Sequence, residues 1–327
     1  MCMEALRVKG INYLIDVNSK LHHTSEFVTP DLVVRRGQPF TIRLDLNREL
    51  FPQDKVVLQL SLKLQAQKLQ DMTLHLTMGP GADPRDWGAT VVHKVQHQVN
   101  SNDDKGILVG SWSGTYPCGT HPGEWTGSSA ILQNFRQTSM PVRYGQCWVF
   151  SGVLTTVMRA IGIPCRSITN FTSAHDTGGN VTVDVYINEN GERLSDVTKD
   201  SIWNFHVWND VWMKRPDLPQ GYDGWQALDS TPQEKSQGIF QCGPAPLYAI
   251  KSGEIKVPHD TKFVFAEVNA DVVTWKVEKS GSGPEKISKL KVQPSMVGRN
   301  ISTKAPGKDT REDITLQYKF PEGEEGS

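Results

Sequence analysis

The pattern of apolar and polar positions changes twice along the chain. From residue 5 to about residue 77, short runs alternate apolar and polar side chains between Gly, Pro and Asn residues. A period of two is typical of half-buried strands, so this part is predicted to be antiparallel β-structure. A Gly/Pro-rich break at 79–87 precedes a predicted mixed α/β segment that reaches about residue 250, and two further strands are predicted at 263–268 and 272–277.

A helical period begins directly after Cys147. The apolar side chains that recur at helical spacing are Phe150, Val153, Leu154, Val157 and Ile161. Gly162 and Pro164 then supply a stop signal. Cys147 is therefore predicted to lie at a helix N-terminus, where unpaired backbone N–H groups and the helix dipole favour a reactive thiolate. A buried structural thiol is the alternative interpretation.

Downstream, an aromatic and β-branched run at 202–213 predicts a strand, and an extended pattern resumes at 225–229 after a turn-like segment. A hairpin between these strands would bring Asp229 beside His206. Strand alternation places His206 on one face of the first strand and Trp203 on the other.

The chain order of a cysteine at a helix start, then a histidine and a carboxylate on adjacent strands, is typical of papain-like enzymes. In such a site the thiolate attacks a carbonyl, the imidazole moves the proton, and the carboxylate orients the imidazole. A histidine on a strand is also commonly a core residue, and that alternative stays open for His206.

Composition narrows the possible partners. The 327 residues are 37% hydrophobic, which is enough to fill the core of one large domain or of two. Thirty-five basic and thirty-six acidic residues leave a net charge of −1, so no nucleic-acid partner is expected. The first ten residues lack an apolar signal region and no transmembrane segment is evident, so the expected location is cytoplasmic, and any export would be non-classical. The five cysteines are irregularly spaced, as expected for free thiols.

Three segments then identify a family. RYGQCWVF, SIWNFHVWNDVWMKRPDLP and GYDGWQALDSTPQEKSQG together resemble the catalytic core of the animal transglutaminases. Near the N-terminus, HHTSEF and VVRRGQPF are similar to the opening strands of that family's β-sandwich. The resemblance implies an α+β fold in which a papain-like cysteine transferase core, residues 88–327, follows a partial N-terminal antiparallel β-sandwich, residues 1–87.

The resemblance also implies an acyl transfer between protein substrates. Cys147 would attack the γ-carboxamide of a protein-bound glutamine, ammonia would leave, and a lysine or polyamine amine would resolve the thioester to an isopeptide bond. His206 would be the general base and acid, and Asp229 would orient it. By the same matching, Trp112 resembles the tryptophan whose indole N–H helps to hold the oxyanion. Trp203 resembles a wall of the amine tunnel that excludes water.

Members of this family are activated by calcium, and the resemblance implies hard oxygen ligands at three places. The candidates are Asn100, Asn102 and Asp104 for a first site, Asp176, Asn180, Thr182 and Asp200 for a second, and Asn269 with Glu322 for a third. Gly178 stands where many relatives carry another carboxylate, so the second site is expected to be weakened.

The chain also departs from the family pattern. Only 99 residues precede the NSNDD motif, where the family places a whole sandwich and the first helices of the core. The two C-terminal β-barrels of the family have no counterpart, so the sequence is interpreted as a shortened form. Two alternatives to the transferase therefore stay open: a catalytically silent form that acts only through binding, and a cysteine amidase or protease that transfers to water. Nothing in the sequence indicates an oligomeric state.

Overall fold

The N-terminal part contains short antiparallel pairs. The computed structural model describes residues 7–22, 24–25, 32, 34, 40–48, 58–61, 73–76, 96, 98–100, 105–279, 285–321 and 323, with backbone only at 58–61 and 73–76. Strand β1 (Val8–Asn12) pairs with β2 (Arg43–Leu46), and β3 (Leu58–Ser61) pairs with β4 (Thr73–Leu76). These pairs confirm the predicted antiparallel structure. The alternating pattern does not predict helix α1 (Ile15–Leu21), which lies between β1 and β2.

A six-stranded antiparallel sheet forms the centre of the remaining chain, in the order β11-β10-β9-β7-β14-β15. Its strands are β7 (Cys165–His175), β9 (Ser201–Met213), β10 (Gly224–Asp229), β11 (Cys242–Pro246), β14 (Arg299–Lys304) and β15 (Arg311–Asp313). The predicted hairpin is confirmed, because β9 pairs with β10 in a regular antiparallel register that sets Leu228 opposite Asn209.

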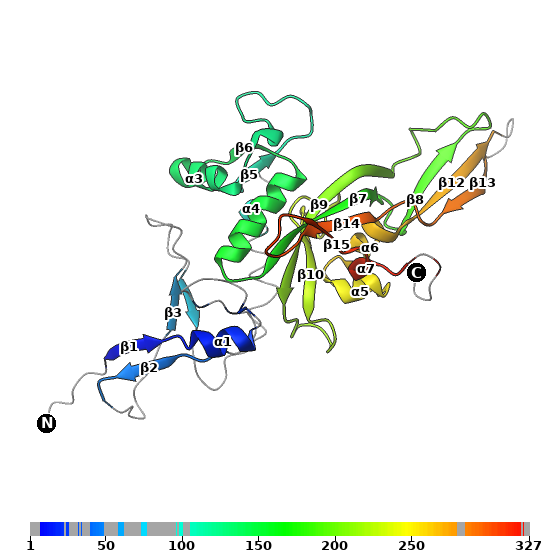
Figure 1. Ribbon diagram of the computed structural model, residues 1–327. Helices are drawn as coiled ribbons and strands as arrows, with labels where there is room; N and C mark the ends of the chain where they lie inside the picture. The colour runs from blue at the N-terminus through cyan, green and yellow to red at the C-terminus, as the bar shows by residue number, and fades with distance from the viewer. Residues whose placement is uncertain are drawn as a thin grey trace.

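Helices cover both faces of this sheet (Figure 1). Helix α4 (Cys147–Ala160), with α3 (Ser128–Thr138) packed on it, closes one face through Phe150, Val153 and Leu154. The helices on the other face are α5 (Leu247–Lys251), α6 (Thr261–Asn269) and α7 (Thr315–Tyr318). Because β9 is covered on both sides, every residue from 206 to 211 is buried, and a strand of this kind carries no simple alternation.

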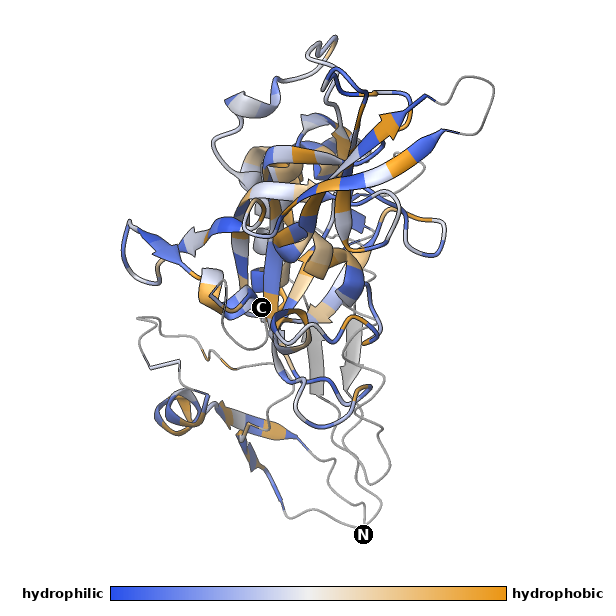
Figure 2. Ribbon diagram, turned by 90° about the vertical axis from the view of Figure 1, so that its right-hand side faces the viewer, coloured by the Kyte–Doolittle hydropathy of each residue, from blue (hydrophilic) through white to orange (hydrophobic). Residues whose placement is uncertain are grey.

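A second sheet has the order β13-β12-β8. Its strands are β8 (Thr182–Ile187), β12 (Asp271–Glu278) and β13 (Lys286–Gln293), and β12 runs parallel to β8. Hydrophilic and hydrophobic residues alternate along β12 and β13 in Figure 2, which is the period-two pattern that predicted the strand at 272–277. That prediction is confirmed.

The strand predicted at 263–268 is wrong, because this segment is helix α6. Its aromatic and β-branched composition favours a strand, yet Val264 and Val268 lie four residues apart and both enter the core. Burial of this helical face overrides the local propensity. The helix brings Glu267 into the interior.

The helix that carries Cys147 is preceded by a short parallel pair, β5 (Leu108–Gly110) with β6 (Val142–Gly145), and a 3-10 turn at Pro122–Glu124 lies between these strands. The domain boundary expected at residue 87 lies outside the described residues. Among the helices that the structure describes, none is long and apolar enough to cross a membrane.

Candidate active site

Cys147 is the first residue of α4 and its side chain is buried. Gln146 precedes the helix with extended backbone, and its side-chain amide donates to the carbonyl of Ser111 at 2.9 Å and to the Tyr116 hydroxyl at 3.1 Å. The chain before the helix is thereby fixed. The predicted position of the thiol at a helix N-terminus is confirmed.

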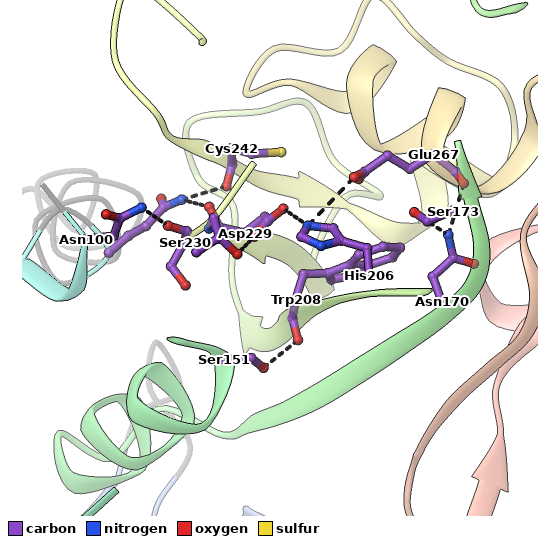
Figure 3. Close-up of polar contacts among 12 residues, drawn as sticks. Asn100, Ser151, Asn170, Ser173, His206, Trp208, Asp229, Ser230, Cys242 and Glu267 are labelled. Atoms are coloured by element: carbon purple, nitrogen blue, oxygen red, sulfur yellow. Dashed lines mark hydrogen bonds and ion pairs between the residues drawn. The ribbon is translucent and has the colours of Figure 1, made fainter. Parts of the chain in front are cut away.

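His206 and Asp229 meet across the β9–β10 hairpin. His206 Nε2 lies 2.6 Å from Asp229 Oδ2, and both side chains are buried (Figure 3). The second carboxylate oxygen, Oδ1, accepts the backbone N–H of Thr231 at 2.8 Å. Since Asp229 holds Nε2, the other ring nitrogen, Nδ1, is the one available to the thiol. No group among the described residues makes a well-aligned hydrogen bond to Nδ1.

The pKa of His206 is raised well above its ordinary value. Burial acts to lower it, but the charge of Asp229 and its hydrogen bond outweigh burial, and hydrogen bonding to Cys147 and the charge of Glu267 add to the rise. A ring that retains its proton near neutral pH is suited to pair with a thiolate and to protonate a leaving amine.

Glu267 is a third ionisable group at this site that the sequence does not reveal. It lies on α6, is 1% exposed, and places Oε1 3.9 Å from His206 Nε2. Neither carboxyl oxygen has a hydrogen-bond partner among the described residues. Burial, with Asp229 adding to it and His206 opposing it, raises the pKa of Glu267 well above its ordinary value. The wrong strand prediction at 263–268 is why this residue was missed.

Aromatic rings surround the three groups. The Trp203 and His206 ring centroids are 6.0 Å apart at nearly a right angle. Strand alternation predicted opposite faces for these two side chains, but the strand pair is distorted here, where Thr172 on β7 has a φ of 52°. Phe205 packs against Trp148, whose backbone directly follows Cys147, with ring centroids 6.0 Å apart.

Trp112 follows a segment that is bound to the residues before Cys147. The Ser111 N–H donates to the carbonyl of Gly145 at 3.1 Å, and the Trp112 ring folds over Gly110. Half of the Trp112 side chain is exposed, and its indole N–H has no partner within the described ranges. The predicted role in holding an oxyanion therefore stays a prediction.

Two buried amides that the sequence analysis did not single out support the site. Gln96 donates to the carbonyls of Asp229 and Cys242, and Asn170 donates to the carbonyl of Glu267 at 3.0 Å (Figure 3). The only signal that could have identified Gln96 and Asn170 is a polar amide at a position that is expected to be buried.

The structure brings together the four residues of the second predicted calcium site from the β7–β8 loop, the start of β8 and the residue before β9. Asp176 and Asp200 are buried, and each carboxylate accepts two backbone N–H groups from the β7–β8 loop or from β8, at 2.6–3.3 Å. The Thr182 hydroxyl donates to Asn180 Oδ1 at 2.8 Å. Oxygen donors from two carboxylates and an amide, with the backbone carbonyl of Thr182 that the resemblance implies, fit the preference of calcium. A Cβ at Gly178 would lie 3.7 Å from Asp176 Oδ1, so the missing carboxylate would point into this set.

The other two predicted calcium sites are only partly described. Asn100 donates from its side-chain amide to the carbonyl of Ser230 at 2.6 Å, which links the first site to the residue after Asp229. Asn102 and Asp104 lie outside the described residues. Asn269 ends helix α6, and its predicted partner Glu322 also lies outside them.

Comparisons with known proteins identify one family. Residues 9–115 match the N-terminal domain model of the transglutaminase family, and residues 124–230 match the core model of the transglutaminase-like superfamily. The chain is 58% identical over 219 residues to protein-glutamine gamma-glutamyltransferase 4 of Homo sapiens, and 54% identical over 235 residues to protein-glutamine gamma-glutamyltransferase 2 of Gallus gallus. The crystal structure of red sea bream transglutaminase superposes with a TM-score of 0.67 at 33% identity, covering 98% of this chain and 66% of that one.

The matched parts cover 67% and 71% of this chain but only 32% and 33% of those two relatives, so the chain spans about a third of their length. The predicted α+β fold with a transglutaminase-like core is confirmed by the family models and by the superposed structure. On the two family models, the curated relatives and the shared fold, the chain belongs to the transglutaminase family.

Proposed function

We propose that this chain catalyses protein-glutamine γ-glutamyl transfer through a thioester on Cys147. The single observation that carries the proposal is the buried pair of His206 and Asp229, 2.6 Å apart, in a chain that also places Cys147 at the start of helix α4. The names of the relatives support the same reaction class. The substrates proposed are a glutamine on one protein and a lysine or a polyamine as the acceptor amine.

In the first half of the reaction, the Cys147 thiolate attacks the γ-carboxamide carbon of the glutamine. The tetrahedral intermediate collapses as His206 donates its proton to the departing nitrogen, and ammonia leaves. Asp229 keeps the imidazolium oriented throughout. Trp112 and the Cys147 backbone N–H are the proposed donors to the oxyanion.

In the second half, an amine attacks the thioester, and neutral His206 accepts the proton that the amine loses. The C–S bond breaks, the isopeptide leaves, and the thiolate–imidazolium pair is restored. Trp203, whose ring lies beside His206, is proposed to shield the thioester from water. Such shielding is what separates a transferase from an amidase.

Calcium is proposed as the activating ion, with the loop of Asp176, Asn180, Thr182 and Asp200 as the site that the described residues support. When bound, the ion supplies positive charge that neutralises the two carboxylates and tightens the loop. Asp200 is directly followed by strand β9, which carries His206. The residues of this loop are thereby connected to the catalytic strand.

The experiment is incorporation of a labelled amine into a glutamine-bearing protein, with and without calcium, by a sample that melts cooperatively. Calcium-dependent incorporation that is lost in Cys147→Ala is the expected result. Cys118→Ala is the matched control, because Cys118 is a free but exposed cysteine and its loss should leave incorporation intact. No incorporation by the folded protein would refute the proposal and favour the silent form.

Release of ammonia without incorporation, in excess amine, would instead assign the chain to the amidases. The cytoplasmic location expected from the sequence stays a prediction.

A further inference from the structure

A second candidate site lies at the far end of the helix that carries Cys147. A cavity of about 570 Å³ opens between the last turns of α4, the start of β7 and the β14–β15 hairpin, which lie side by side in Figure 1. Its volume is within the range of small-molecule sites. Arg159 on α4 lines it twelve residues after Cys147, which corresponds to about 18 Å along a helix. The cavity is therefore separate from the candidate active site.

The charged side chains around this cavity are mostly basic. Arg159, Arg166, Lys304 and Arg311 line it, against a single carboxylate, Asp309. Arg166 is already paired with the buried Asp210 at 2.9 Å, and Arg311 is paired with Asp313 at 2.6 Å, just outside the lining. The positive charge that no carboxylate balances therefore comes from Arg159 and Lys304.

Of the four basic residues that line the cavity, Arg159 and Lys304 have no ion pair with a carboxylate among the described residues. Arg159 donates through Nε to the carbonyl of Cys165 at 2.8 Å, which fixes the guanidinium and leaves its two terminal nitrogens unpaired. Lys304 donates to the carbonyl of Lys308 at 2.7 Å, so its ammonium group is held in the hairpin with two further N–H donors. Fixed, unpaired cations on two facing elements favour an anion between them.

The rest of the lining is rich in hydroxyl groups. Ser302 and Thr303 are buried, and their hydroxyls donate to the carbonyls of Asn300 and Ser167. The Ser302 hydroxyl also accepts the Arg311 Nε–H at 2.7 Å, which fixes Arg311 against the lining. The hydroxyls of Thr169 and Thr310 have no partner among the described residues. Among the described residues, no aromatic side chain lines the cavity, so these residues offer no platform on which a nucleobase could stack.

We propose that this cavity binds a small phosphate monoester of a sugar or polyol. The phosphate would bind between Arg159 and Lys304, and the hydroxyls of the carrier would exchange hydrogen bonds with Thr169 and Thr310. Asp309 opposes the anion at the rim of the cavity, so it lowers the affinity and favours hydroxylated over purely anionic ligands.

Calorimetric titration of the 327-residue chain with glucose 6-phosphate tests the proposal, with glucose, inorganic phosphate and glucose 6-sulfate as comparison ligands. Glucose 6-phosphate is expected to bind with 1:1 stoichiometry, inorganic phosphate more weakly, and glucose not measurably. Arg159→Gln removes one charge-assisted contact and should weaken binding of glucose 6-phosphate about tenfold. The double variant Arg159→Gln/Lys304→Gln should weaken it about tenfold again.

Two further variants keep the result interpretable. Lys308→Gln removes the same charge from the same hairpin outside the lining, and it should change the affinity less than about twofold. Asp309→Asn is an exposed change that should leave folding intact and tighten binding. Equal affinities for the double variant and Lys308→Gln, weaker binding to Asp309→Asn, or tighter binding of the sulfate ester would each overturn the assignment.

Discussion

Replacement of Tyr318 by phenylalanine tests how the catalytic strand is held. Tyr318 lies on α7 and is fully buried, and its hydroxyl accepts the Trp208 indole N–H at 2.8 Å while donating to Asp210. Trp208 and Asp210 flank Asn209 on β9, and the Trp208 ring centroid lies 6.0 Å from that of His206. One hydroxyl therefore connects helix α7 to the strand that carries the candidate base.

The size of the effect follows from the two bonds. Loss of the hydroxyl leaves a buried indole N–H without an acceptor and removes a donor from a buried carboxylate, at costs of about 1–3 and about 1.5–3 kcal/mol. The free energy of unfolding is therefore expected to fall by about 4 kcal/mol at pH 8, where Asp210 is ionised.

The same reasoning predicts the pH dependence. Burial, opposed by Arg166 and Tyr318, raises the pKa of Asp210 to about 6. An acid whose pKa is raised by folding binds its proton more tightly in the folded state, so the free energy of unfolding falls as the pH rises from the ordinary pKa of the acid through its raised pKa. Removal of the Tyr318 hydroxyl raises the pKa further. At pH 5 Asp210 is protonated in the folded wild type and in folded Tyr318→Phe. The loss of unfolding free energy caused by Tyr318→Phe should therefore shrink to about 2 kcal/mol, mostly from the unpaired Trp208 indole N–H.

Urea unfolding of the wild type and of Tyr318→Phe at pH 5 and pH 8 measures the loss of unfolding free energy at each pH. Tyr248→Phe is the matched control, because Tyr248 is 59% exposed and should change the unfolding free energy by less than about 0.5 kcal/mol. A loss in Tyr318→Phe no larger than in this control, or a loss larger at pH 5 than at pH 8, would refute the reasoning.

Three more changes have defined outcomes. Asp229→Asn should lower kcat/KM about 10⁴-fold. Because Asp229 raises the pKa of His206, the same change should also move the alkaline limb of the pH–rate profile to lower pH. An alkaline limb that does not move would contradict the role assigned to Asp229. Gly178→Asp should tighten calcium binding about tenfold in a calcium titration, since it restores a carboxylate to the loop; unchanged affinity would remove this loop from the proposed calcium ligands. Leu154→Ala should lower the free energy of unfolding by about 3 kcal/mol in urea, because the side chain is fully buried beneath α4; a loss below about 1 kcal/mol would show that the core there repacks.

The helix and the hairpin of the candidate site could be predicted from the sequence because each follows one repeating pattern of apolar and polar residues. The apolar spacing after Cys147 fixes α4 and places the thiol at its first residue. The aromatic strand and the turn that follows it fix the β9–β10 hairpin, and register alone then brings Asp229 to His206. Each inference required only neighbours within one element or one hairpin.

Side-chain direction within β9 could not be predicted in this way. Alternation assigns Trp203 and His206 to opposite faces, but the chain near Thr172 leaves ideal strand geometry and the two rings meet. The alternation of side chains describes a regular strand, so it does not predict a local distortion of the backbone at a functional site. The resemblance to the family assigned Trp203 to the amine tunnel but predicted no contact between these two rings.

Helix α6 was misassigned for a different reason, and the error concealed a group at the active site. Aromatic and β-branched residues dominate 263–268, so propensity favours a strand, while the helical face depends on a core built from β9, β10 and β11. Glu267 reaches His206 and Asp229 only through that packing. Burial raises the pKa of Glu267 well above its ordinary value, with the charge of His206 opposing the rise and that of Asp229 adding to it, so the neutral form of Glu267 is favoured beside this pair. An ionised Glu267 would add an unpaired charge to the interior, so the arrangement of all three groups, and not the sequence near any one of them, determines its protonation.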